Sequence, residues 1–324
     1  MERLKQAGSA VAVVAALGLF MIGSSQNVQS YHHAPSPSVS KPMNANATIL
    51  FGGDLMFDRS IRIAMMKNGD DHVFSCIDDM LKDVDLVVAN LEGPITSYPS
   101  KSMGSTVGGE GNYTFTFPTS TAVLLARHTI RLVNLGNNHI MNFGREGLAE
   151  TKQWLDSAGV GYFGDPDLLE SERVERISIN EISFSFVNWS DWTSDKTDHT
   201  VAQVRTEKDA GRIVVVYTHW GEEYVPPPSR VKELAHSFVD AGADIVIGSH
   251  PHIVQEHELY RGTYIYYSLG NFLFDQYWNE AVRRGLLLRV VVTPTGVSSL
   301  EEIPIDNQRD RRMCAVPGDL QPSQ

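Results

Sequence analysis

The sequence predicts one α/β domain in which helices cover both faces of a β-sheet. Short β-branched runs, typical of buried strands, alternate with helical stretches along most of the 324 residues. Segments with a two-residue hydrophobic period and no intervening helix indicate antiparallel strands added to that sheet. The composition, 42% hydrophobic and 20% charged, is that of an ordinary globular protein. We therefore expect an α/β sandwich.

The charge and the cysteines narrow the possible functions. The net charge of -12 argues against nonspecific nucleic-acid binding, which needs a basic surface, so no nucleic-acid partner is expected. A polyanionic ligand would need local Lys or Arg side chains or a metal ion. Cys76 and Cys314 are far apart and form no CxxC pattern, so neither a disulfide nor a thiolate site can be inferred from them.

The N-terminus predicts export from the cytoplasm. Arg3 and Lys5 precede an apolar run at 10–22, which is typical of a secretory signal. The run is short for a spanning helix, which needs ~20 apolar residues. Residues 1–25 are thus expected to be a signal peptide or a membrane anchor, with the domain at the outer side of the cell membrane or secreted. The other predicted parts are a disordered linker at 26–47, a folded domain at 48–305 and a loose polar tail at 306–324.

The first half of the domain begins with a strand at 48–51. Helices at 59–67 and 73–82 lead to a buried strand at 85–89. The polar stretch 97–111 contains four glycines and is a long loop, a class that is often a functional lid or simply mobile. The next expected elements are a short strand at 113–117, a helix at 119–128, a strand at 131–135 and an amphipathic helix at 144–158.

The second half continues the alternation of strands and helices. The runs at 174–179 and 182–187 predict an antiparallel pair around a short turn. Helices are expected at 201–210 and at 229–241, the latter capped by Ser229. Further strands are expected at 213–217, 244–247, 264–267, 286–292 and 300–305.

Polar side chains follow the ends of five predicted strands. They are Asp54, Glu92, Asn138 with His139, His219, and His250 with His252. Ligands bind beyond the carboxyl ends of strands in open α/β sheets. Carboxylates, an amide oxygen and imidazoles suit Mn, Fe or Zn better than Ca or Mg. A bound metal would lower the pKa of its water.

The same residues also have ordinary structural explanations. Asp54 and Glu92 could cap helices. Asn138 and Asn271 could satisfy backbone groups in turns. His219, beside Trp220, could be a buried histidine with its hydrogen bonds satisfied.

Six motifs in order resemble the CapA family, the bacterial capsule synthesis proteins linked to poly-γ-glutamate. The resemblance runs from about Thr48 to Val292. The motifs are Gly53-Asp54-Leu55-Met56, Asn90-Leu91-Glu92-Gly93, Asn137-Asn138-His139, His219-Trp220-Gly221 with Glu223-Tyr224, the segment from Gly242 to His252, and Ser268-Leu269-Gly270-Asn271-Phe272.

That family is in turn similar to calcineurin-like metallophosphoesterases, which implies a four-layer α/β/β/α sandwich with mixed sheets and one or two divalent metals. The ligands that the resemblance assigns are Asp54, Glu92, Asn138, His219, His250 and His252. His139 resembles the histidine that donates a proton to a leaving group. Asn271 and Glu223, inside the matching motifs, are predicted to bind substrate.

Three departures from the metallophosphoesterase pattern alter the predicted site. Met56 replaces the histidine of the D-x-H motif, so one ligand of the first metal is missing. Glu92 replaces an aspartate in a differently spaced motif. Asn142 stands where CapA sequences often carry an acidic residue, so no carboxylate is expected to orient His139. The preferred site is a single metal held by Asn138, His219 and His250 with help from Glu92.

Three functions follow from the sequence. The first is an exported or membrane-anchored protein of capsular poly-γ-glutamate synthesis or export, with the anionic polymer and membrane synthase subunits as partners. Its metal cleft would bind, and hydrolyse or transfer, its substrate. The second is a non-catalytic, polymer-binding subunit of a membrane synthase. The third is an extracytoplasmic metal-dependent phosphoesterase with no capsule role. The sequence does not decide whether the protein catalyses a reaction.

Overall fold

The structure is a computed structural model that describes residues 45–169, 172–193 and 196–317. The predicted signal or anchor at 1–25, and the linker up to residue 44, lie outside the described residues. In the described part of the chain, no helix is both long enough and apolar enough to cross a membrane.

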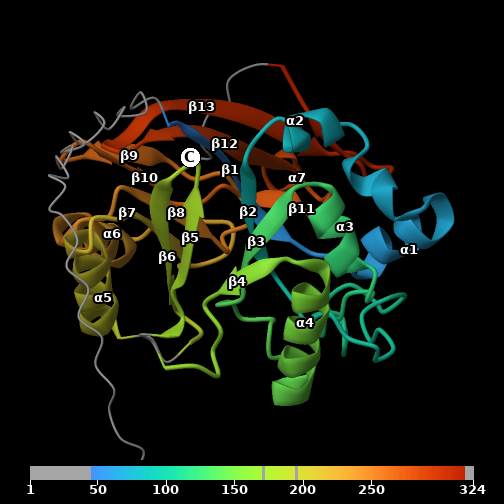
Figure 1. Cartoon of the computed structure of the whole chain (residues 1–324). Helices are drawn as coiled ribbons and strands as arrows, with labels where there is room; N and C mark the ends of the chain where they lie inside the picture. Colours follow the sequence, from blue (N-terminus) through green and yellow to red (C-terminus); the bar gives the residue numbers. More distant parts are fainter. Residues whose placement is uncertain (1–44, 170–171, 194–195, 318–324) are drawn as a thin grey trace, which may run out of the picture. The chain divides into compact units, whose positions relative to one another are not determined.

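Two β-sheets form the centre of the domain (Figure 1). The first sheet has eight strands in the order β14-β13-β12-β1-β2-β3-β4, and β11 pairs with β1 beside this path. Its strands are β1 (Ala47–Leu55), β2 (Leu86–Leu91), β3 (Ile130–Asn134), β4 (Gly161–Phe163), β11 (Asn271–Leu273), β12 (Arg284–Thr293), β13 (Gly296–Asn307) and β14 (Met313–Ala315).

The second sheet has six strands in the order β5-β6-β7-β8-β10-β9. Its strands are β5 (Glu175–Ile179), β6 (Ile182–Ser190), β7 (Ile213–His219), β8 (Ile245–Ser249), β9 (His257–Tyr260) and β10 (Thr263–Tyr266). The helices are α1 (Arg59–Asn68), η1 (Asp70–Phe74), α2 (Asp78–Lys82), α3 (Thr121–Arg127), α4 (Gly144–Ala158), α5 (Thr197–Asp209), α6 (Ser229–Ala241) and α7 (Glu280–Arg283).

Three hydrophobic cores separate four layers. One core lies between the two sheets, where Phe51 and Val88 of the first sheet meet Phe186 and Ile247 of the second. A second core joins the outer face of the first sheet to α1, α3 and α4, and a third joins the outer face of the second sheet to α5 and α6. Figure 1 shows these helix groups on opposite sides of the sheets. The predicted α/β/β/α sandwich is confirmed.

The long elements agree with the sequence prediction, and two short ones do not. Helix α4 has the predicted bounds and ends at Gly159, whose φ of 69° is the left-handed value that a helix stop requires. The predicted strand at 113–117 is wrong, because only Phe117 forms a bridge, to Ile95. Its alternation reflects the burial of Phe115 and Phe117. The predicted helix at 73–82 is broken into η1 and α2.

The predicted loose tail at 306–324 is corrected for residues 306–317. The strand β14 pairs with β13, and Cys314 within it forms a disulfide with Cys76, 238 residues earlier in the sequence. Strand β14 has only three residues, so their pattern alone did not predict a strand. Residues 318–324 lie outside the described part.

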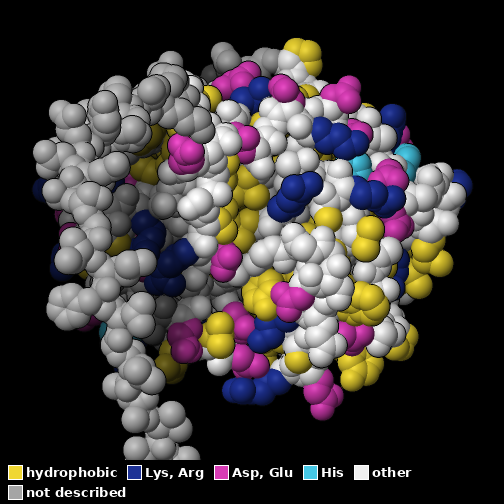
Figure 2. Space-filling view, viewed as in Figure 1, with side chains coloured by type: hydrophobic (Ala, Val, Ile, Leu, Met, Phe, Trp, Pro, Cys, Tyr) yellow, Lys and Arg dark blue, Asp and Glu magenta, His cyan; other side chains and the backbone are white. Residues whose placement is uncertain are grey.

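The visible surface carries charges of both signs. In Figure 2, Lys and Arg side chains are interspersed with Asp and Glu side chains over the face that is shown.

Candidate metal centre

The carboxyl ends of strands from both sheets meet at one place. In the first sheet β1 and β2 run parallel, and Asp54 lies opposite Asn90 in register. Glu92 is the first residue after the end of β2. In the second sheet β7 ends at His219 and β8 leads to His250. The two sheets come together here, since His219 Nδ1 is 3.8 Å from Asp54 Oδ1. Three sets of side chains lie with ligand atoms within 4.8 Å of one another: Glu92, His219 and His250; Glu223, His250 and His252; and Asp54, Glu92 and His252.

Asp54 is fully buried, and both of its oxygens are held by the protein. Oδ1 accepts a hydrogen bond from Asn90 Nδ2 at 2.8 Å, and Oδ2 accepts one from the backbone N–H of His250 at 3.1 Å. Burial by itself would raise the pKa of this carboxyl, but the hydrogen bond and the charge of His252 outweigh burial and hold the pKa below its ordinary value. Asp54 is therefore a carboxylate, the form that binds a cation.

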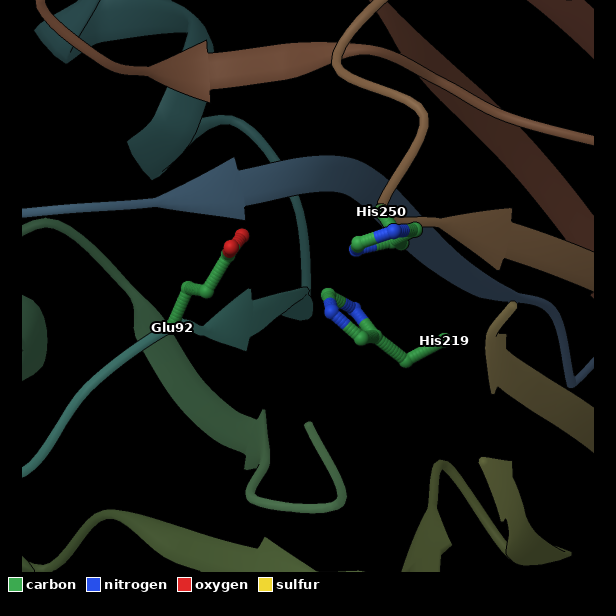
Figure 3. Close-up of side chains that lie close together, drawn as sticks. All are labelled: Glu92, His219 and His250. Carbon is green, nitrogen blue, oxygen red and sulfur yellow. The ribbon is translucent and has the colours of Figure 1, made fainter. Parts of the chain in front are cut away.

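Glu92 is the least satisfied side chain of the cluster. It is fully buried, and neither carboxyl oxygen has a hydrogen-bond partner among the described residues. Figure 3 shows this carboxyl group directed toward the imidazoles of His219 and His250. Burial, and then the charge of Asp54, raise the pKa of Glu92 well above its ordinary value. A buried carboxyl group without a partner is costly, and a cation bound between it and the histidines would supply that partner.

Two histidines of the cluster, His219 and His250, are held as neutral rings. Burial lowers the pKa of His219 well below its ordinary value and lowers that of His250 to about 3. His252 lies with Nδ1 2.9 Å from Asn271 Oδ1 and Nε2 3.5 Å from Glu92 Oε1. The backbone φ angles of His250 and His252 are 96° and 57°, in the left-handed region that non-glycine residues rarely adopt. Neutral imidazole is the form that ligates metals.

Asn138 and His139 lie at the edge of this cluster. Asn138 Oδ1 is 2.9 Å from His219 Nε2, so the amide oxygen and the ring nitrogen face the same space. His139 Nδ1 is 3.1 Å from Asn142 Oδ1, which also accepts the backbone N–H of Phe115. An amide oxygen thus orients His139 in place of a carboxylate, and it leaves Nε2 directed toward Glu92 Oε1 at 3.9 Å. Burial lowers the pKa of His139 to about 4.

The two residues predicted to bind substrate differ in their surroundings. Asn271 is fully buried and lies behind His252, and its amide nitrogen donates to Val282 O and Gln276 Oε1. This placement does not fit substrate binding and makes Asn271 a support for His252. Glu223 is exposed, and one of its oxygens lies within ligand distance of His250 and His252.

Sequence reasoning missed several residues of the site. Asn90, opposite Asp54 in the sheet, was part of a matching motif but had no assigned role. Ser249 Oγ lies 3.0 Å from His219 Nδ1, and its position directly before His250 was the available signal. The rings of Trp192 and Tyr224 lie against His250 and His252, with centroids 4.0 and 6.1 Å apart. Tyr224 belongs to a matching motif, and Trp192 lies in a predicted loop where it could line a polymer groove or simply pack, but the sequence did not indicate their contacts with the two histidines.

Known proteins are similar in sequence to this chain over most of the domain. The family model "Bacterial capsule synthesis protein PGA_cap" matches residues 48–276. The PGA biosynthesis protein CapA of Bacillus subtilis (strain 168) is 31% identical over 291 residues, covering 84% of this chain and 75% of that protein. The capsule biosynthesis protein CapA of Bacillus anthracis is 30% identical over 285 residues, covering 82% and 68%.

A more distant relative extends the comparison. A probable polyglutamine synthesis accessory protein of Mycobacterium tuberculosis (strain CDC 1551 / Oshkosh) is 31% identical over 222 residues, covering 58% of each chain. The family match includes Asp54, Glu92 and the histidines of the cluster. The resemblance found in the sequence motifs is confirmed. The chain belongs to the family of bacterial capsule synthesis proteins, PGA_cap.

Proposed function

We propose that the protein serves the synthesis or export of capsular poly-γ-glutamate outside the cytoplasm. We further propose that its strand-end cluster holds a divalent metal in a cleft that binds this polymer and cleaves or transfers it. Family membership and the names of the two Bacillus relatives support the capsule role. The basic and apolar N-terminal pattern supports export, with attachment to the cell membrane beside synthase subunits.

The observation that carries the metal is the unpartnered, buried carboxyl group of Glu92. His250 Nδ1 is also buried without a hydrogen-bond partner among the described residues. Carboxylate, amide oxygen and imidazole ligands together fit Mn, Fe or Zn. Asn138, His219, His250 and Glu92 would hold this ion.

A second metal position is less complete. It would rely on Asp54 and His252, because Met56 cannot supply the missing ligand. The Met56 side chain is fully buried in the core of the first sheet, where its sulfur accepts the backbone N–H of Asp58. The proposal is therefore one metal.

The chemistry divides between the ion and the protein. A divalent cation supplies Lewis acidity, which lowers the pKa of a water molecule and neutralises developing negative charge. His139, whose Nδ1–H is held by Asn142 Oδ1, would take a proton at Nε2 from the attacking water and pass that proton to the leaving group. The buried walls formed by Phe115 against His139 and Phe274 against His252 exclude bulk water from one side of the cleft.

Aromatic side chains at the mouth of the cluster support polymer binding. Trp192, Tyr224 and Trp278 are between 40% and 58% exposed, and Trp278 lies edge-on to Tyr224 at 5.4 Å. Exposed aromatic faces beside a polar site bind the apolar parts of ligands. The methylene stems of a γ-linked glutamate chain are such parts, while its carboxylates would be neutralised by the metal.

The proposed reaction is tested by replacing His139. We expect the metal-loaded His139→Ala variant to shorten poly-γ-glutamate about 10² to 10⁴ times more slowly than the wild type, because the proton transfer is lost. Metal content and polymer affinity should stay unchanged, since His139 is outside the three ligand sets. The readout is polymer length by gel filtration after incubation with each protein, and His257→Ala on the exposed strand β9 is the control.

A second candidate is the non-catalytic, polymer-binding subunit of a membrane synthase. The replacement of a metal ligand by the buried Met56 favours it. In this case the wild type binds metal and polymer but shortens neither poly-γ-glutamate nor a panel of phosphoesters. Turnover of phosphoesters alone would instead identify a phosphoesterase.

A further inference from the structure

We infer that Asn90 is a positioning residue of the metal centre, and that its amide group holds the His219 ligand of the second sheet beside Asp54 of the first sheet. The inference rests on the proposed metal site. It assigns a role to a fully buried residue whose amide nitrogen lies against Asp54 and His219.

The Asn90 amide contacts four polar groups. Its Oδ1 accepts from Asn134 Nδ2 at 3.0 Å and from Asn137 Nδ2 at 3.1 Å. Its Nδ2 donates to Asp54 Oδ1 at 2.8 Å and lies 3.2 Å from His219 Nδ1. Both acceptor positions of the amide oxygen are therefore occupied, and the nitrogen lies between Asp54 and the His219 ring.

The orientation of the Asn90 amide is fixed by its neighbour Asn137. Asn137 Oδ1 accepts the backbone N–H groups of His139 and Ile140, so the Asn137 nitrogen is the atom that must face Asn90. The same nitrogen donates to Leu91 O at 2.9 Å. Two N–H donors therefore meet Asn90 on one side, and its own NH₂ must point toward Asp54 and His219. A flipped Asn90 would place N–H against N–H.

The NH₂ group connects the two sheets at the point where the ligands meet. Asp54 ends β1 of the first sheet, and His219 ends β7 of the second. The row of amides continues across the domain, because Asn188 Nδ2 of β6 donates to Asn134 Oδ1 at 2.9 Å. All of these asparagines are buried. Groups that orient metal ligands typically change metal affinity 10- to 100-fold when they are removed.

The test compares two buried asparagines of the same row in the full chain. Isothermal titration with Zn²⁺ and with Mn²⁺ is expected to show that Asn90→Ala binds about 10 to 100 times more weakly than the wild type. Asn188→Ala removes a similar buried amide, which joins the row by donating to Asn134, and it should bind metal within about threefold of the wild type. Thermal unfolding without metal should show both variants destabilised, which separates folding from ligand positioning.

A second variant guards against a misfolded Asn90→Ala. In Asn90→Ser, the hydroxyl group can still accept a hydrogen bond from Asn134 or Asn137, but the side chain is too short to reach Asp54. This variant should also bind metal about 10-fold or more weakly than the wild type. The inference is overturned if both Asn90 variants bind as tightly as the wild type, or if Asn188→Ala loses as much as Asn90→Ala. If the wild type binds neither ion, the proposed metal centre fails, and this inference fails with it. If the wild type binds metal and the Asn90 variants bind it equally tightly, only this inference fails.

Discussion

The Glu92→Gln variant is expected to lose metal binding and yet to be more stable than the wild type in the absence of metal. Glutamine keeps the shape of the side chain but removes a buried carboxyl group whose ionisation is opposed by burial and by the charge of Asp54. At a pH where the wild-type carboxyl is ionised, this removal should raise the free energy of unfolding by about 1–3 kcal/mol in chelator. At a metal concentration of about 1,000 Kd the wild type alone gains about 4.1 kcal/mol, so the order of stabilities should reverse.

The reversal is measured by chemical unfolding of both proteins in EDTA and in excess Zn²⁺ or Mn²⁺. Loss of the ion should also abolish metal-dependent turnover. Glu222→Gln provides the matched control, because Glu222 is exposed and belongs to no candidate ligand set, so its unfolding should respond to metal as the wild type does. If Glu92→Gln is destabilised equally with and without metal, Glu92 is a structural side chain and the proposed ligand role fails.

The Gly53→Ala variant is expected to lose at least about 3 kcal/mol of stability and to lose the metal site with it. A Cβ at this position would lie 1.8 Å from the backbone oxygen of Gly270. That oxygen accepts the N–H of Asp54 at 3.1 Å, so it cannot move away without breaking the pairing of β1 and β11. The clash is with backbone, and no side-chain rotation relieves it.

This effect is measured by thermal unfolding, where about 3 kcal/mol corresponds to a fall of roughly 6–12 °C in a domain of this size. Gly161→Ala in β4 is the control, since β4 is the edge strand of the same sheet and an added Cβ would meet nothing closer than 3.3 Å. A Gly53→Ala protein that melts with the wild type would show that β11 does not approach β1 as described.

Local patterns were sufficient where an element makes its own hydrophobic face. Helix α4 has an amphipathic period and a glycine stop, and its bounds were predicted without error. Buried strands such as β7 were also recognised, because every side chain in them is apolar or nearly so. The short strands β4, β9 and β11, of three or four residues each, were missed. Strands β4 and β11 pair with β3 and β1, which are distant in the sequence, whereas β9 pairs with the next strand, β10, but is too short for its pattern to predict a strand.

The disulfide shows the same limit for covalent structure. Cys76 lies between η1 and α2, and Cys314 lies in β14, so their proximity depends on the pairing of β14 with β13. No spacing rule applies across 238 residues. The burial of Phe115 and Phe117 gave a false strand for a related reason, because inward-facing rings alternate in an irregular segment as they do in a strand.

The residues of the candidate site were mostly predictable, but the relations among them were not. Strand ends identified Asp54, Glu92 and His219, because parallel strands bring their carboxyl ends to one edge. The unpartnered state of Glu92 and the engagement of Asn90 by four groups are properties of the assembled cluster. Asn271 was assigned to substrate, since sequence cannot show that a polar side chain is buried behind a histidine.

The metal content of the full-length protein tests the central claim most directly. After loading with Mn²⁺, Fe²⁺ or Zn²⁺ and removal of free ion, inductively coupled plasma mass spectrometry should find about one equivalent of metal in the wild type. The His250→Ala variant should retain little, because His250 belongs to two of the three candidate ligand sets. A wild type that retains none of these ions, or a variant that retains as much as the wild type, would contradict the metal centre described here.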